Sequence, residues 1–434
     1  MASRHQQIET GRRSGRLWAG LLLLMAALCL CRPATADAGS AEAIRAADLR
    51  AMIVERHPAV AAARAALGEA EAARRGAGSW PDPELEGRLL WDGDGGSDIE
   101  GALRFPIPWS GRLASARRAA QLNVELARLD LETARHQAAV EADRQLARLA
   151  WSRSLVELNE ALAARSSEQA RLAAQRREAN LADPLEVSLV LADAARDRRA
   201  LIESRNEEST ISAMLRLLAG LPLGEEWIET APLSWAPPAL DRETLLSMAL
   251  EHGPKLAGAR LRLEQRGQEV KQAGRARLPD LRLGPAVQWD DIGTSWGLAV
   301  GIPLPLFGRT RADLEAARAR QLGAEDALDL ESRTLPVRVE ILLARLEALE
   351  EGLAELSGEA AEATDQAFRL AQARWSTGKI DVLHLLLAHR AFAEIRIERL
   401  DTLLQLRETW LDLSLAVGRP LNSADDSAAT ETGP

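Results

Sequence analysis

From Leu113 to Ala179 the chain contains neither proline nor glycine, and it is rich in alanine, leucine, arginine and glutamate. These residues favour helix, and at about 1.5 Å per residue the segment would form a rod about 100 Å long. No ordinary globular core encloses such a rod. Its apolar residues follow two stripes, one through Leu122 and Leu126 and another through Val124. Two stripes predict neighbouring helices on two sides.

A second constraint is an internal duplication. FPIPWSGR at 105–112 recurs as IPLPLFGR at 302–309, an offset of 197 residues (302 minus 105). Other pairs follow in the same order at nearly the same offset: HPAV with GPKL, WPDP with LPDL, ANLADPLEVSLVLA with STGKIDVLHLLLA, and LAGLPL with AVGRPL. The period is far longer than that of a solenoid repeat. The chain therefore contains one module written twice.

Each module is predicted to contain a helix, two strands, a long helix, a turn and a final helix. The first helix is expected at 45–77 in the first copy and at 241–277 in the second, ended by prolines. The predicted fold class is mainly α with a small β part. Residues 1–36 are predicted to be a signal peptide and 422–434 a flexible tail. The first repeat is predicted at 37–223, with strands at 83–106 and a helical hairpin at 113–219, and the second at 224–421, with strands at 280–304 and a helical hairpin at 310–417.

The strand segments alternate between apolar and polar residues. Leu85 and Leu89 share one face opposite Glu86, and Trp296 and Leu298 share one face opposite small or polar residues. At about 9–11 residues each, the segments are long enough to cross an outer membrane. Four strands cannot close a barrel by themselves, and lipid does not tolerate an open edge. Either several chains pool their strands, or two hairpins cap a helical periplasmic protein.

The N-terminus has the pattern of a secretory signal. Arginines precede a short apolar run that ends in Ala34-Thr35-Ala36, a small-residue cleavage pattern. Both cysteines, Cys29 and Cys31, lie within the segment expected to be removed, and leucines precede each of them, which disfavours lipidation. The mature chain is thus expected to contain no disulfide and no cysteine metal site.

Composition excludes other classes of function. The net charge is −10, and no basic cluster with interleaved aromatic residues indicates nucleic-acid binding. No phosphate-binding loop, nucleophile elbow or paired histidine–acid motif indicates catalysis. No cofactor is expected. The histidines lack the spacing of metal-binding motifs. The two histidines of HLLLAH at 384–389 are five residues apart, so on a helix their rings point in different directions. No metal site is therefore assigned.

These motifs resemble those of the TolC family of outer-membrane efflux proteins. HPAV, SWPDP, FPIPWSGR, LPDL, IPLPLFGR, STGKIDVL and AVGRPL carry the resemblance over nearly the whole mature chain, and IPLPLFGR is most similar to the CzcC-like heavy-metal branch. The resemblance implies a homotrimer whose chains form a 12-strand outer-membrane β-barrel continued by a long periplasmic α-helical barrel. It also implies a periplasmic adaptor, an inner-membrane RND pump and outer-membrane lipid as partners.

The resemblance also assigns roles to particular residues. The strand-to-helix turns at the membrane exit would comprise Pro106, Gly111, Arg112, Pro303, Gly308 and Arg309. The hairpin tips that meet the adaptor would comprise Asn180, Leu181, Asp183, Thr377, Gly378 and Lys379. A periplasmic constriction would contain Asp381 and His384, with histidine where the family commonly has a second acid. The residues equally permit plain capped turns at these positions.

The predicted function is a passive exit duct of a tripartite efflux pump, in the outer membrane of a Gram-negative bacterium and extending into the periplasm, that exports heavy-metal cations. The alternatives are a duct for drug efflux or type I secretion, or a periplasmic coiled-coil scaffold or adaptor without a barrel. No enzymatic activity is expected.

Overall fold

The structure is a computed structural model that describes residues 44–91, 97–222, 228–230, 233, 237–238, 241–290, 293–303 and 308–421. The chain divides into two units, Met1–Ala43 and Ile44–Pro434, and every described residue belongs to the second. The predicted signal peptide at 1–36 and the predicted tail at 422–434 lie outside the described residues.

Each predicted first helix is in fact two helices. The first copy contains α2 (Ala46–Arg56) and α3 (Pro58–Gly76), and the second contains α6 (Arg242–His252) and α7 (Pro254–Arg275). His57 and Gly253 have extended ψ angles of 129° and 116°. A residue before proline is disfavoured in the helical region, because the proline ring collides with its backbone. The expected continuous helices at 45–77 and 241–277 were therefore wrong.

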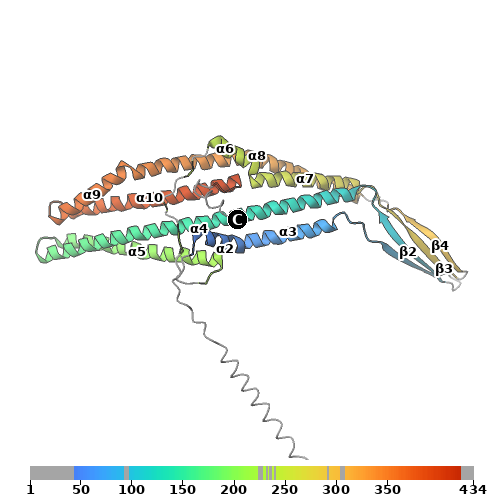
Figure 1. Cartoon of the computed structure of the whole chain (residues 1–434), viewed down its shortest axis with the longest axis horizontal. Coiled ribbons are helices and arrows are strands. Elements are labelled where there is room, and N and C mark those ends of the chain that lie inside the picture. The colour runs from blue at the N-terminus through green and yellow to red at the C-terminus, as the bar shows by residue number, and fades with distance from the viewer. Residues whose placement is uncertain are drawn as a thin grey trace, which may run out of the picture. The chain divides into compact units, whose positions relative to one another are not determined.

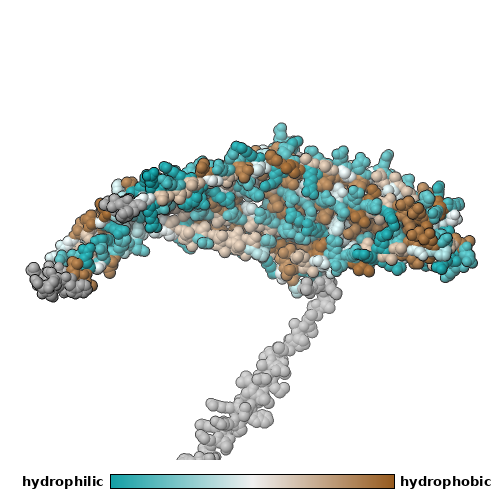
Figure 2. Space-filling model, turned by 180° about the vertical axis from the view of Figure 1, so that it is seen from behind, coloured by the Kyte–Doolittle hydropathy of each residue, from teal (hydrophilic) through white to brown (hydrophobic). Residues whose placement is uncertain are grey.

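The four strands form one antiparallel sheet in the order β1 (Glu84–Trp91), β2 (Ser97–Ile107), β3 (Leu281–Asp290) and β4 (Gly293–Gly301). The register pairs Leu85 with Leu103, Phe105 with Leu283, and Leu283 with Val300, so apolar residues from all four strands share one face. The large apolar side chains of this face are exposed, including Leu298 at 69%. Figure 2 shows apolar surface at the strand end of the molecule.

Ion pairs cross the opposite face of the sheet. Arg104 pairs with Glu86 at 2.5 Å across β1 and β2, and Arg282 pairs with Glu84 at 3.0 Å. Because successive residues of a strand point to opposite faces, one face of the sheet is apolar and the other charged or small.

The long predicted helix is present as α4 (Arg112–Glu178), 67 residues without interruption, followed by α5 (Pro184–Ala219). Its counterpart in the second copy is divided into α8 (Arg309–Ser357) and α9 (Glu359–Ser376), followed by α10 (Val382–Val417). The interruption is at Gly358, whereas Pro336 lies inside α8. No helix among the described residues is long and apolar enough to span a membrane.

Helix α4 is the element against which most other helices pack: α2, α3, α5, α7 and α10 all contact it. Figure 1 shows the strands at one end of α4, and the turns that follow α4 and α9 at the other. The second copy packs in the same way around α8, which contacts α6, α7, α9 and α10.

Buried apolar side chains form separate clusters along the helices. A cluster near the turns contains Phe368, Trp375 and Leu385, while another further along contains Leu335 and Leu406. Fully burying such a side chain contributes about 1.5–3 kcal/mol. A succession of small cores, rather than one central core, therefore holds this unit together.

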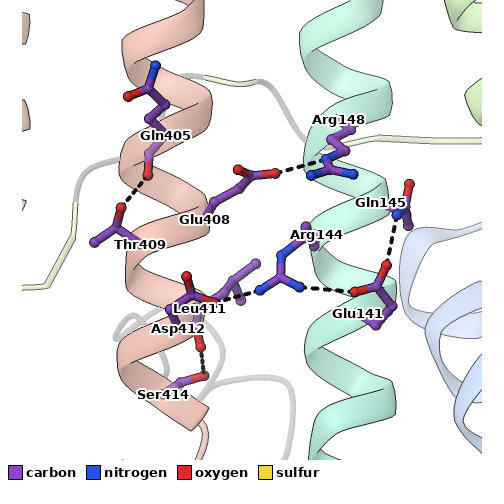
Figure 3. Close-up of polar contacts among 10 residues, drawn as sticks. All are labelled: Glu141, Arg144, Gln145, Arg148, Gln405, Glu408, Thr409, Leu411, Asp412 and Ser414. Carbon is purple, nitrogen blue, oxygen red and sulfur yellow. Dashed lines mark hydrogen bonds and ion pairs between the residues drawn. The ribbon is translucent and has the colours of Figure 1, made fainter. Parts of the chain in front are cut away.

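Polar contacts align α4 with α10 (Figure 3). Arg144 Nη2 donates to Asp412 Oδ1 at 2.6 Å, and Arg148 Nε donates to Glu408 Oε1 at 2.8 Å. Arg144 also bonds Glu141 on its own helix at 3.0 Å. All these side chains are partly exposed, and pairs of this kind contribute about 1 kcal/mol or less each. They therefore fix which residues of the two helices lie opposite one another more than they stabilise the fold.

Candidate functional site

The duplication is visible in backbone conformation at three pairs of matching positions. Gly111 and Gly308 precede the long helices with φ of 73° and 74°. Asn180 and Gly378 follow the long helical arms with φ of 57° and 71°. Gly220 and Gly418 end the modules with φ of 65° and 82°. The left-handed region is accessible to glycine and, less easily, to asparagine. Both copies therefore use a residue in the left-handed conformation at each of these turns.

The first strand-to-helix turn is attached to the second module. Arg112 forms an ion pair with Asp280, and the Trp109 indole nitrogen donates to the carbonyl oxygen of Pro279 at 2.9 Å. Arg275 donates to the carbonyl oxygen of Gly111 at 2.8 Å. Pro106 is buried in the penultimate position of β2, so the strand continues one residue beyond it.

The second strand-to-helix turn is described in part. Pro303 follows the end of β4, Gly308 is the residue before α8, and Arg309 begins that helix as an exposed residue. Residues 304–307 lie outside the described part of the chain. The predicted residues of each turn thus run from the end of a strand to the first residue of a long helix.

The predicted tip residues lie at the two turns opposite the sheet. Asn180, Leu181 and Asp183 lie between α4 and α5, and Thr377, Gly378 and Lys379 lie between α9 and α10. All six are exposed. Asp183 caps α5 by accepting a hydrogen bond from the amide of Leu185 at 2.7 Å, with Pro184 as the first helical residue.

Three side chains that the sequence did not indicate join the two tips. Arg176 at the end of α4 donates to the carbonyl oxygen of Trp375 at 2.9 Å and lies 3.3 Å from Glu186. The Trp375 indole nitrogen donates to Glu186 at 2.8 Å, and the Arg176 guanidinium lies 5.2 Å from the centre of the Trp375 ring. Both charged side chains are 17% exposed. The two tips are thus one connected surface.

The predicted constriction residues follow the second tip directly. Asp381 is the residue before α10, and its side chain makes no capping hydrogen bond. His384 is in the first turn of α10, and both side chains are exposed. In this single chain both side chains face solvent, and the His384 amide donates to the Asp381 carbonyl oxygen at 3.2 Å.

One group of three possible metal ligands occurs among the described residues, close to the tips. His389 on α10 donates from Nε2 to Asp197 Oδ2 of α5 at 2.9 Å, and Asp193 Oδ2 lies 3.8 Å from the same nitrogen. Burial raises the pKa of the Asp193 carboxyl, an effect that His389 opposes and the charge of Asp197 reinforces. Sequence patterns did not indicate this group, because His389 lies 192 residues from Asp197 along the chain.

The chain is similar to known outer-membrane proteins. Residues 245–419 match the family model described as Outer membrane efflux protein. The cobalt-zinc-cadmium resistance protein CzcC of Cupriavidus metallidurans is 23% identical over 342 residues, which cover 78% of this chain and 81% of that protein.

Solved structures with the same fold include two outer-membrane proteins. The outer membrane protein VceC of Vibrio cholerae has a TM-score of 0.72 at 20% identity, covering 87% of this chain and 97% of that one. The CmeC outer membrane channel of Campylobacter jejuni has a TM-score of 0.75 at 13% identity, covering 89% and 88%. The CmeC structure is described as a channel and the VceC structure as an outer membrane protein.

The family match, the CzcC similarity and the shared fold agree with one another. The family description and the descriptions of both solved structures are of outer-membrane proteins. Less than half of the chain thus matches the model described as Outer membrane efflux protein, and the chain as a whole has the fold of the VceC and CmeC outer-membrane proteins.

Proposed function

We propose that three copies of this chain form the exit duct of a tripartite pump, with a 12-strand barrel in the outer membrane and a helical tunnel below it. The observation that carries the proposal is the four-stranded sheet. Its edge strands, β1 and β4, each pair on one side only, and its apolar face is exposed. An exposed apolar face is stable against lipid, but unpaired strand edges are tolerated there only when the sheet closes. Pooling the strands of several copies supplies that closure.

The exported substrate is proposed to be a heavy-metal cation. The similarity to CzcC, whose name describes resistance to cobalt, zinc and cadmium, supports this substrate class. An exposed Asp381 beside the second tip also supports it, because threefold symmetry would turn one carboxylate into a ring that attracts cations.

The partners are proposed to be a periplasmic adaptor, which contacts the exposed tips, and an inner-membrane RND pump. Lys379 and Leu181 are exposed at the two tips and are suited to such contacts. Replacing Lys379 with glutamate is expected to weaken co-purification with the adaptor while leaving the oligomer mass unchanged.

The first test is the mass and location of the complex. The envelope is fractionated, the protein is extracted in mild detergent, and the mass of the complex and its conductance in a planar bilayer are measured. A conducting trimer from the outer-membrane fraction is expected. A non-conducting monomer or dimer from the periplasm would instead support the scaffold or adaptor alternative.

The second test addresses the substrate. Deleting the gene is expected to sensitise the host to cobalt, zinc or cadmium salts, and not to hydrophobic drugs. Sensitivity to drugs alone would support the drug-efflux alternative while leaving the channel assignment intact.

A further inference from the structure

The buried group Asp193, Asp197 and His389 lies between the two helical hairpins. The aspartates are four residues apart on α5 and share one face of that helix, while the histidine comes from α10. The His389 side chain is 2% exposed and those of Asp193 and Asp197 are 4% and 13% exposed. One ligand atom from each residue lies within 4.8 Å of the others.

The hydrogen bonding within this group is incomplete. Asp193 Oδ2 is buried and has no hydrogen-bond partner among the described residues. Arg196 and Arg390 approach the other oxygen of Asp193 at 3.1 Å and 3.9 Å, but their side chains are 61% and 51% exposed. Leaving a buried carboxylate oxygen without a partner is costly. A cation at this oxygen would remove that cost, and both arginine side chains are more than half exposed.

We propose that Asp193, Asp197 and His389 bind one divalent first-row transition-metal ion, such as Zn²⁺, that links α5 to α10. Carboxylate oxygen and imidazole nitrogen are ligands that Zn²⁺ accepts at about 2.0–2.2 Å, which places neighbouring ligand atoms about 3–4 Å apart. The distances from His389 Nε2 to the two aspartates, 2.9 Å and 3.8 Å, are close to that range. Three protein ligands leave a further position for water.

The site has a structural role in this proposal. It lies within the first turns of α10 and about three turns into α5, so a bound ion would hold the two tips in one arrangement. The proposal does not rest on the exported substrate, because the ligands are buried in the helix layer.

The test uses full-length protein extracted in mild detergent and stripped with EDTA. Zn²⁺ is titrated against it in competition with a chromogenic chelator, and the melting temperature is measured with and without Zn²⁺. One ion per chain and a higher melting temperature are expected. Asp197→Asn and His389→Gln should weaken binding by more than about tenfold. His252→Gln, on α6, is the matched control and should bind as the wild type does.

A spectroscopic measurement keeps the test decisive if His389→Gln fails to fold. Co²⁺ bound to the wild-type protein should show the visible absorption of a four- or five-coordinate site with nitrogen and oxygen ligands, and Asp197→Asn should lose it. The proposal is overturned if the folded wild-type protein binds no stoichiometric Zn²⁺. It is also overturned if Asp381→Asn removes the binding while Asp197→Asn retains it, since the ion would then lie at the predicted constriction.

Discussion

At the scale of single residues, the contact between the tips depends on Arg176. Its guanidinium joins α4 to the carbonyl of Trp375 and to Glu186, and all three groups are largely buried. Arg176→Ala leaves the Glu186 carboxylate and the Trp375 carbonyl without this donor. We expect a loss of about 1–3 kcal/mol in local stability, measured as faster amide hydrogen exchange at 180–187 and 374–382.

The control for this variant is Arg171→Ala on the same helix. Arg171 pairs with Glu168 at 2.6 Å, but both side chains are more than half exposed. Exposed pairs contribute little, so exchange at the tips should remain unchanged. Equal effects of the two variants would show that the tips are not joined through Arg176.

A second prediction at this scale concerns Asp365, which receives two hydrogen bonds of 2.9 Å from Arg396 and links α9 to α10. Partial burial alone favours the neutral acid, but the hydrogen bonds and charges of Arg396 and Arg369 outweigh it and lower the pKa of Asp365. A lowered folded-state pKa stabilises the protein above the ordinary value of 3.8, and this stabilisation is lost as the pH falls through the folded value.

Asp365→Asn is therefore expected to lower the melting temperature at neutral pH, by an amount that shrinks as the pH falls below 3.8. Melting curves of both proteins across this range, at constant ionic strength, measure the difference. A difference that stays constant down to the most acidic condition would contradict the assignment.

At the scale of elements, the sheet offers a test of its two faces. Leu298 and Ser295 lie on the same strand, β4, but three residues apart, so they point to opposite faces. An arginine on a lipid-facing strand costs about 2–4 kcal/mol near the bilayer midplane. Leu298→Arg should therefore reduce the assembled protein in the outer membrane, while Ser295→Arg should assemble. Equal assembly of the two variants would contradict a lipid-facing apolar surface.

At the scale of the whole molecule, the proposed trimer predicts selectivity at the tip end. Three copies of Asp381 around a common axis would attract cations, so Asp381→Asn is expected to reduce the preference for cations over anions. Reversal potentials in a planar bilayer under a salt gradient measure this preference. Glu168→Gln, at an exposed carboxylate of α4, provides a charge-matched control. An unchanged reversal potential in Asp381→Asn would exclude this residue from the constriction.

Much of the fold was predictable because it depends on local properties. The 67 residues of α4 contain no helix breaker, and the alternating strand segments have a period that only a strand satisfies. The left-handed turns at Asn180 and Gly378 occur where the sequence placed residues that tolerate this conformation. The strand-to-helix turns and the exposed tips could be located for the same reason, although their proposed roles remain predictions.

Interruptions within the helices were less predictable, because packing decides which breaker is effective. Pro336 lies inside α8 without ending it, and its neighbours Leu335 and Val339 are buried against α10. Gly358 has no comparable packing and leaves the helical conformation with φ of −89° and ψ of −138°. At Pro336, burial of the neighbouring side chains thus outweighed the cost of proline within a helix. At Gly358, no such burial offset the low helix propensity of glycine.

By itself, the sequence determined the duplicated order of helices and strands, the two faces of each strand and the positions of the turns. These follow from composition and spacing within short segments. Only the tertiary structure decided that Arg176 meets Trp375 and Glu186, and that His389 meets Asp193 and Asp197. Such pairs join residues that are distant in the chain, and the way α4, α5, α9 and α10 pack, rather than any local pattern, brings them into contact.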